Sequence, residues 1–229
     1  CDPARQAALA TVAAACGARL LTLDAHGGGS WSEAVAAADA GSAAGHEPRG
    51  RDELAAIVYT SGTTGRSKGA MLTHGNLESN ARTLVELWRF DARDVLLHAL
   101  PIYHVHGLFI ATHCPLLAGA PMRLPPRFDV AALLELLPRS TAFMGVPTYY
   151  VRLLEAAAFD REVARNVRVF ICGSAPLLPA TFEAFERRTG QRILERYGMT
   201  ETGGVAPKPH CGGSPPRRAG LAPPRVRPR

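Results

Sequence analysis

The sequence predicts an α/β fold in which parallel-rich sheets are flanked by helices, and three observations support that class. Short apolar runs of strand length alternate with longer segments whose apolar residues recur at helical spacing. Hydrophobic residues make up 47% of the 229 residues, enough for a sizeable buried core. Glycine or proline stands at several of the boundaries, as expected where crossover helices connect parallel strands.

The first fifty residues predict a helix, a strand and a second helix. The Ala-rich segment 4–15 has helical character, and Gly17 separates it from a short apolar strand at 18–23. A surface helix is expected at 30–40, followed by a flexible connector rich in Gly, Ala and Ser that reaches Arg51. The apolar run 53–58 then predicts a strand.

The rest of the chain predicts regular alternation. A helix with a possible Asn76 cap is expected at 74–90. Further strands are expected at 94–100, 121–125, 141–146, 167–173 and 192–198. Further helices are expected at 130–138, 147–158 and 178–190. No internal repeat is visible.

Charge and cysteine usage narrow the function classes. The formal net charge is +6, but five arginines and one lysine fall in the last 27 residues, where no acidic residue stands. The rest of the chain is close to neutral, so a nucleic-acid partner has little support. The five cysteines are widely separated and have no metal-binding spacing, so reduced thiols are expected. No apolar run is long enough for a membrane span.

The segment "YTSGTTGRSKG", residues 59–69, carries the chemistry that is easiest to interpret. Its glycines let the backbone approach a ligand, its hydroxyl groups add hydrogen-bond donors, and Lys68 adds positive charge, so the loop suits a polyphosphate. A mobile linker is the simpler alternative. A Walker-type loop does not match, because it needs Gly-Lys-Ser/Thr in succession and Ser67-Lys68-Gly69 occupy those places.

Four segments together resemble the adenylate-forming superfamily of acyl-CoA synthetases, luciferases and adenylation domains. They are "YTSGTTGRSKG" (59–69), "LPIYHVHGL" (100–108), "GSAPL" (173–177) and "RYGMTE" (196–201), in that family's order. The finer pattern, including "FMGVPTYYVRLL" and "LERYGMTET", resembles malonyl-CoA synthetases. The resemblance implies ATP-dependent activation of malonate, or of methylmalonate, followed by thioester formation with coenzyme A.

The resemblance also implies roles for particular residues around ATP. The phosphate cradle would comprise Thr60, Ser61, Gly62, Thr63, Thr64 and Gly65, with Lys68 closing over it. Thr200 would contact the α-phosphate and Glu201 would bind Mg²⁺, a cation that prefers oxygen ligands. The adenine site would comprise Gly173, Ser174, Ala175, Pro176, Tyr197 and Gly198. Taken alone, the Thr-Glu pair is typical of a helix cap, and the 173–177 segment of a strand-ending turn.

For the acyl substrate, the resemblance places His104 and His106 beside the acyl and CoA channel, although an isolated histidine is more often structural. The second carboxylate of malonate needs a cation, because burying it unpaired costs several kcal/mol in order of magnitude. Arg196 and Arg152 are the candidates, since a guanidinium can hold a carboxylate at two points. The alternative is a surface arginine paired with Glu195 or Glu155.

The family pattern covers residues 1–202, which we interpret as a partial N-terminal adenylation domain. Residues 203–229 are rich in Pro and Arg and are expected to be disordered and outside the family pattern, and a change of reading frame is the hypothesis for this shift. We expect the family's C-terminal domain to be missing and this chain alone to be inactive. A short- or medium-chain acyl-CoA synthetase and a non-catalytic nucleotide-binding module remain alternatives. A cytoplasmic location is the default expectation, and oligomeric state is left open.

Overall fold

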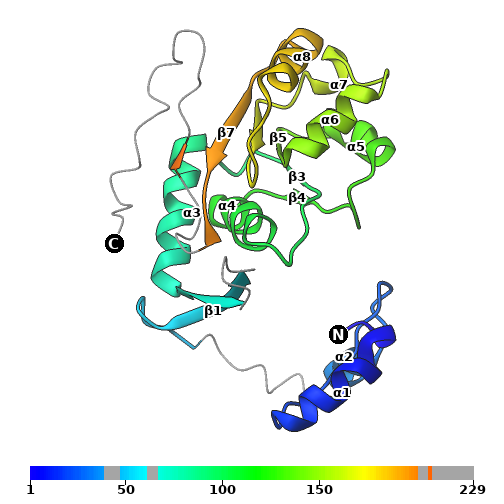
Figure 1. Ribbon diagram of the computed structural model, residues 1–229, viewed down its shortest axis with the longest axis vertical. Coiled ribbons are helices and arrows are strands. Elements are labelled where there is room, and N and C mark those ends of the chain that lie inside the picture. Colours follow the sequence, from blue (N-terminus) through cyan, green and yellow to red (C-terminus); the bar gives the residue numbers. More distant parts are fainter. Residues whose placement is uncertain (39–46, 61–66, 201–205, 208–229) are drawn as a thin grey trace. The chain divides into compact units, whose positions relative to one another are not determined.

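The computed structural model describes residues 1–38, 47–60, 67–200 and 206–207 of the chain. These residues belong to two compact units, Cys1–Pro48 and Arg49–Arg229. Figure 1 shows the elements of both units in chain order by colour. The larger unit holds every residue for which the sequence predicts a role in binding or catalysis.

The smaller unit contains a 3-10 turn, Pro3–Arg5 (η1), and two helices, α1 (Gln6–Ala15) and α2 (Ser30–Ala36). Both expected helices are confirmed, but the strand expected at 18–23 is wrong. The backbone at Thr22 forms hydrogen bonds with the first residues of α2 instead. The Thr22 N–H donates to Ser30 Oγ (2.9 Å), and the Thr22 carbonyl accepts from the Trp31 N–H (2.9 Å).

The larger unit begins with an antiparallel hairpin of β1 (Leu54–Thr60) and β2 (Lys68–Thr73). The strand before the predicted phosphate loop is therefore confirmed, while β2 was not expected. Thr60 and Lys68 are register partners, and Thr60 Oγ1 donates to the Lys68 carbonyl over 3.4 Å. The hairpin thus brings the two ends of the loop together, and a strand follows it where a Walker-type loop would have a helix.

Helix α3 (His74–Trp88) begins with a capping box at Thr73. Thr73 Oγ1 accepts from the Asn76 N–H (3.1 Å), and Asn76 Oδ1 accepts from the Thr73 N–H (3.0 Å). The cap expected at Asn76 is therefore wrong, because the capping residue is Thr73, three positions earlier. Asn76 occupies the third position of the helix, and its amide oxygen accepts a hydrogen bond from the backbone N–H of Thr73, the capping residue.

A six-stranded sheet forms the centre of this unit, with the strand order β4-β3-β5-β6-β7-β8. All neighbouring strands are parallel except β7 and β8, so the parallel-rich α/β prediction is confirmed. The strands are β3 (Leu96–His98), β4 (Met122–Arg123), β5 (Ala142–Gly145), β6 (Val169–Cys172), β7 (Ile193–Tyr197) and β8 (Ala206–Pro207).

Helices connect successive strands. They are a π-helix, η3 (His106–Ile110), then α4 (Ala111–Ala118), α5 (Val130–Leu136), the 3-10 turn η4 (Leu137–Arg139), α6 (Pro147–Glu155), α7 (Arg161–Ala164) and α8 (Pro179–Thr189). The sequence analysis assigned nothing to η3 and α4. That segment is apolar on nearly every side and includes Pro115, so it lacks the periodicity that marks an amphipathic helix.

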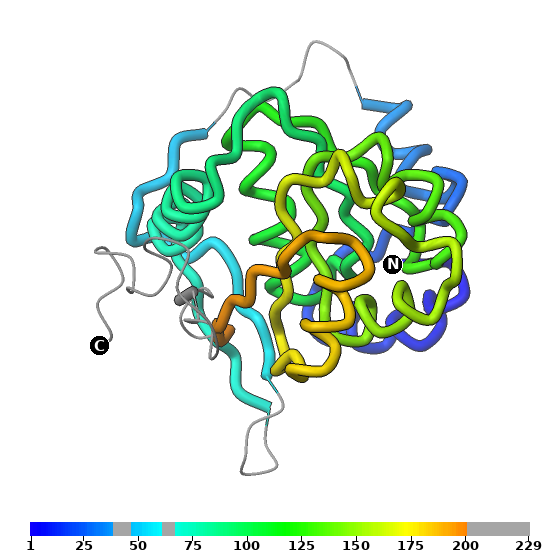
Figure 2. The backbone as a smooth tube through the Cα atoms, turned by 90° about the horizontal axis from the view of Figure 1, so that it is seen from above, coloured from blue at the N-terminus to red at the C-terminus, as the bar shows by residue number. Residues whose placement is uncertain are grey.

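Alternate residues of the central strands pack into two separate hydrophobic cores, one on each face of the sheet. On β5, Met144 belongs to a core with Leu84 of α3 and Cys114 of α4, whereas Phe143 belongs to a core with Tyr150 of α6 and Phe185 of α8. Figure 1 shows α3 and α4 on one side of the strands and α5 to α8 on the other, and Figure 2 shows the same division at right angles. The sheet is covered on both faces, as parallel sheets require.

The connections reverse direction between β3 and β5. The chain leaves β3 through α4 on one face and enters the neighbouring β4, whereas it leaves β5 through α6 and α7 on the other face and enters β6. Where neighbouring parallel strands diverge in this way, a crevice opens at their carboxyl ends, and ligands of open α/β sheets bind there. This topology therefore indicates where a site should lie.

Candidate functional site

Three adjoining cavities lie at the carboxyl ends of the strands. The first, about 130 Å³, is lined by residues that follow β3, β6 and β7: His104, Val105, His106, Ile110, Ser174, Arg196, Gly198, Met199 and Thr200. The second, about 290 Å³, is mainly apolar and adds residues around Pro101 and Pro147 after β3 and β5. The third, about 150 Å³, lies between the Ser174–Pro176 turn and Glu195–Gly198.

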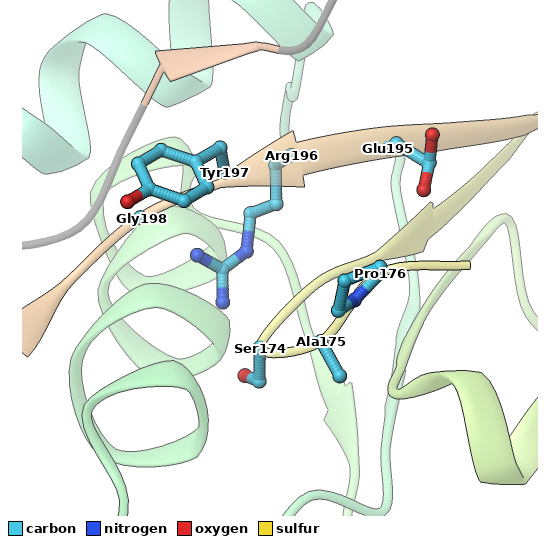
Figure 3. A pocket seen from close by; sticks show the side chains of 7 residues that line it. All are labelled: Ser174, Ala175, Pro176, Glu195, Arg196, Tyr197 and Gly198. Atoms are coloured by element: carbon cyan, nitrogen blue, oxygen red, sulfur yellow. The ribbon is translucent and has the colours of Figure 1, made fainter.

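The turn after β6 forms one wall that the cavities share. Ser174 has a φ of +70°, a left-handed conformation that is uncommon for a residue with a side chain. Gly173 lies directly against Arg196, because a Cβ atom there would be 2.7 Å from Nε and 2.8 Å from Cζ. Figure 3 shows the Arg196 side chain extending from β7 toward this turn. Glycine at 173 therefore leaves the space that the guanidinium occupies.

Arg196 carries a charge that is buried without a counter-ion among the described residues. Its exposed fraction is only 7%, its Nε has no hydrogen-bond partner, and no ion pair within the described part of the chain includes it. Burial lowers the pKa of Arg196 to about 10, so it stays protonated at neutral pH. The alternative of a surface arginine is wrong, and Glu195 instead accepts from the Leu177 N–H (3.0 Å).

His106 lies beside Arg196 and is also buried, with an exposed fraction of 3%. Its Nδ1 is 3.1 Å from Ser174 Oγ, while its Nε2 is buried without a partner. Burial first, and then the positive charge of Arg196, hold the pKa of His106 well below 6.5, so the ring is neutral at pH 7. The first cavity thus presents one fixed positive charge and one neutral imidazole, a combination suited to an anionic group.

His104 and Thr200 line the same cavity from its more exposed side. Tyr197 is 60% exposed at the third cavity, together with Ala175, Pro176 and Gly198. The structure therefore brings the residues predicted for the adenine site together with Arg196, His104 and His106 of the predicted acid site. Their individual roles stay predictions.

The predicted phosphate loop is described only at its ends. Thr60 is half-buried and Lys68 is exposed, on opposite strands of the hairpin. Ser61, Gly62, Thr63, Thr64 and Gly65 lie outside the described residues, as does Glu201, the predicted Mg²⁺ ligand. Within the described residues no cluster of three or more His, Cys, Asp or Glu side chains could hold a metal ion.

Arg152, the other candidate for the second carboxylate, lies elsewhere. It is exposed on α6, and its guanidinium is 5.8 Å from the ring centre of Phe128. It lines none of the three cavities. The structure therefore separates Arg152 from Arg196, because the α6 residues that face inward are the apolar Tyr150 and Leu153.

Sequence reasoning missed His98, the last residue of β3, which contacts the loop that carries His104 and His106. Its ring nitrogens bond Gly107 (3.0 Å) and Leu100 (3.3 Å). A histidine at the end of a buried strand, just before a segment of suspected function, is the signal that could have drawn attention to it.

Comparison with known proteins agrees with this geometry. A model of the AMP-binding enzyme family matches residues 4–228. The chain belongs to the AMP-binding enzyme family. The predicted adenylate-forming fold is thereby confirmed, and so is the similarity to malonate–CoA ligases.

A malonate–CoA ligase of Arabidopsis thaliana is 41% identical over 170 residues, covering 66% of this chain and 28% of the relative. MatB of Rhodopseudomonas palustris with ATP bound is 50% identical, with a TM-score of 0.89, over 98% of this chain and 44% of that one. A malonyl-CoA ligase in a ternary product complex with methylmalonyl-CoA and AMP is 37% identical, with a TM-score of 0.65, over 68% and 35%. The chain spans less than half of each of these proteins.

The segment expected to lie outside the family pattern, 203–229, is described only at Ala206–Pro207. Its expected disorder and the boundary at residue 202 therefore stay predictions. No helix among the described residues is long and apolar enough to cross a membrane.

Proposed function

We propose that this AMP-binding protein is an ATP-dependent acid–thiol ligase that activates malonate, and also methylmalonate, and joins it to coenzyme A. One observation carries the choice of acid: Arg196 is a buried cation that faces a cavity and has no acidic partner among the described residues. The similarity to the Arabidopsis malonate–CoA ligase and to MatB supports it.

The proposed reaction has two steps. A carboxylate oxygen of malonate attacks the α-phosphorus of ATP, forming the acyl adenylate as pyrophosphate leaves. The thiol of coenzyme A then loses its proton and attacks the acyl carbon, and AMP leaves with the bonding electrons. Negative charge gathers in both steps, so the protein contributes mainly by positioning and by fixed positive charge.

Arg196 would hold the carboxylate of malonate that does not react. A guanidinium can donate two parallel hydrogen bonds to a carboxylate, and burial of Arg196 limits competition from bulk water. His106 is neutral and has a free Nε2, so it can add a hydrogen bond without adding charge. The other carboxylate would then point toward the ATP site, which we place at the third cavity and the β1–β2 hairpin.

Lys68 and Thr60, at the two ends of the hairpin loop, would hold the leaving phosphates, and Thr200 would contact the α-phosphate. Glu201 would hold Mg²⁺, which would supply positive charge that offsets the charge of the phosphates. Glu201 lies outside the described residues, so this part of the proposal rests on the family resemblance.

The proposal is tested by ATP–pyrophosphate exchange with malonate, methylmalonate, acetate and octanoate in parallel, using a full-length enzyme that contains this chain. We expect malonate to be the best acid. Replacing Arg196 with Met should lower kcat/KM for malonate roughly 30-fold, the equivalent of about 2 kcal/mol for hydrogen bonds to a charged group. Acetate, which has no second carboxylate, should be affected far less.

Arg152→Met is the matched control, since Arg152 is exposed and lies outside the cavities. It should change malonate activity by less than about twofold. Higher activity with acetate or octanoate than with malonate would favour a ligase for monocarboxylic acids. Binding of ATP and malonate by that full-length protein without exchange would favour the non-catalytic nucleotide-binding module. A cytoplasmic location stays a prediction.

A further inference from the structure

His98 has a position that the proposed chemistry does not use. It is the last residue of β3 and only 2% of it is exposed. Its two ring nitrogens bond two different points of the following segment, the Leu100 N–H (3.3 Å) and the Gly107 carbonyl (3.0 Å). These two points are the ends of the loop that carries His104 and His106. One imidazole therefore spans the base of the loop.

The partners of His98 determine its tautomer. The Leu100 N–H can only donate, so Nδ1 must accept and carry no proton. The Gly107 carbonyl can only accept, so Nε2 must carry the proton. Burial lowers the pKa of His98 despite the opposing effect of the Gly107 carbonyl, so the ring is neutral at pH 7. Both ring nitrogens are then satisfied, which a buried imidazole requires.

The loop depends on contacts at its base. Its tip projects into solvent, with Ile102 64% and Tyr103 85% exposed. At the base, Gly107 lies so close to Pro101 that a Cβ atom would be 2.2 Å from the Pro101 carbonyl oxygen. Thr112 Oγ1 also donates to the Gly107 carbonyl (2.9 Å). Gly107 already belongs to the π-helix η3 (His106–Ile110), a form of helix often found at functional sites.

We propose that His98 is a positioning residue, which closes the Leu100–Gly107 loop and thereby directs His106 into the cavity beside Arg196. His106 immediately precedes the carbonyl-bearing residue that His98 holds. A shift of that peptide would move the His106 ring away from Ser174 Oγ, its partner at 3.1 Å. Only the measurement of malonate binding depends on the proposed function; the NMR tests do not.

The first test uses the unchanged chain. Nitrogen-15 NMR of histidine-labelled protein at pH 7 should show His98 neutral with its proton on Nε2. A proton on Nδ1, or a charged ring, would overturn the proposal, because neither state can bond both Leu100 and Gly107 as observed.

The second test compares His98→Gln and His98→Asn with His113→Gln. A glutamine amide can reach the place of Nε2 and an asparagine amide the place of Nδ1, so each variant keeps one hydrogen bond of the two. His113 is the control because it is half-buried on α4 and its pKa is also lowered by burial. Each variant is first checked for folding by circular dichroism.

We expect both His98 variants to change the NMR signals of the His106 ring and to weaken malonate binding, measured by calorimetry, roughly fivefold, as expected for one lost hydrogen bond. His113→Gln should do neither. Folded His98 variants with unchanged His106 signals would overturn the proposal. If the unchanged chain binds no malonate, the proposed function fails, but the His106 signals still decide the role of His98.

Thr112→Val provides a milder variant in case both His98 variants fail to fold. It removes only the second donor to the Gly107 carbonyl. The His106 ring signals should shift in this variant as well. Unchanged signals would show that the position of Gly107 does not control His106, and the proposal would be wrong.

Discussion

Arg168 and Arg196 lie at opposite ends of the strands of the same parallel sheet, and they differ in whether their charge is paired. Arg168, just before β6, donates from Nε and Nη2 to the two oxygens of Asp94 (2.8 and 2.5 Å). It also donates to the carbonyls of Trp88 and Arg89, each at 2.9 Å. Arg196, near the end of β7, has neither a carboxylate nor a partner for its buried Nε among the described residues.

Arg168 is a structural cation, whereas under the proposed function Arg196 binds the acid substrate. Arg168 connects the end of α3 with the amino ends of the strands through hydrogen bonds. Asp94 also accepts from Thr141 Oγ1 (2.7 Å), so Arg168 and Asp94 both have hydrogen-bond partners. An unpaired buried charge costs free energy, and Arg196 lies at the carboxyl ends of the strands, where α/β proteins bind ligands. The four predictions that follow test this distinction.

The largest effect is expected at Arg168. Replacing it with Met leaves the Asp94 carboxylate, whose side chain is 5% exposed, without its cation. We expect a loss of about 3 kcal/mol in the free energy of unfolding, the lower end of the range for such changes because Arg168 is itself 40% exposed. Urea denaturation measures the loss.

Arg165→Met is the control for this prediction. Arg165 is paired with Glu162 on the surface, so removing it should cost less than about 1 kcal/mol. Equal losses in the two variants would mean that the Asp94–Arg168 pair is no more than an ordinary surface contact.

Acid should affect the Arg196 end of the sheet before the Arg168 end. The pKa of His106 is well below 6.5 in the folded chain. Below pH 6.5 the unfolded chain therefore binds a proton at His106 more readily than the folded chain does. Stability should therefore fall with decreasing pH by up to about 1.4 kcal/mol per pH unit for this group. His98 and His113, whose pKa values are also lowered, add to the slope.

Asp94 behaves differently. Burial alone would raise its pKa, but hydrogen bonds from Arg168 and Thr141 more than offset this and lower it. The stability that Asp94 contributes is therefore present above its unfolded pKa, near 4, and is lost only as the pH falls below that value. Urea midpoints should begin to decline near pH 6.5 and decline more steeply below about pH 4. His106→Gln should flatten the decline between about pH 6.5 and 4, and an unchanged slope in that variant would contradict the assignment.

Most of the sheet could be predicted from the sequence because each strand is a short apolar run next to an amphipathic helix. The segment 106–118 could not, because η3 and α4 are apolar on most sides and no period distinguishes them. The residues of the site were found through motifs. What the motifs left open was burial: they offered both Arg196 and Arg152 as candidates, and the fold shows that Arg196 is the one that faces the cavity.

Gly173→Ala should have an intermediate effect that depends on Arg196. The new Cβ would lie 2.7 to 2.9 Å from Nε, Cζ and Cγ of Arg196, so the guanidinium must move. We expect a loss of about 1 to 2 kcal/mol in stability, as for overpacking, and weaker malonate binding. In an Arg196→Ala background the same change should cost much less. Additive losses in the double variant would show that the two residues do not interact.

The smallest effect is expected at Arg196, and it distinguishes the two arginines most directly. Replacing Arg196 with Met, the same change as at Arg168, removes a charge that no described carboxylate balances, and Met fills similar space. Without ligand we expect the free energy of unfolding to be unchanged or to rise by about 1 kcal/mol. Malonate at about 100 times its Kd should stabilise the original chain by about 2.7 kcal/mol, but Arg196→Met by less than about 1 kcal/mol, because binding to that variant is roughly 30-fold weaker. A loss of 2 kcal/mol or more without ligand would make Arg196 a structural residue like Arg168, and the site would lose its anion-binding group.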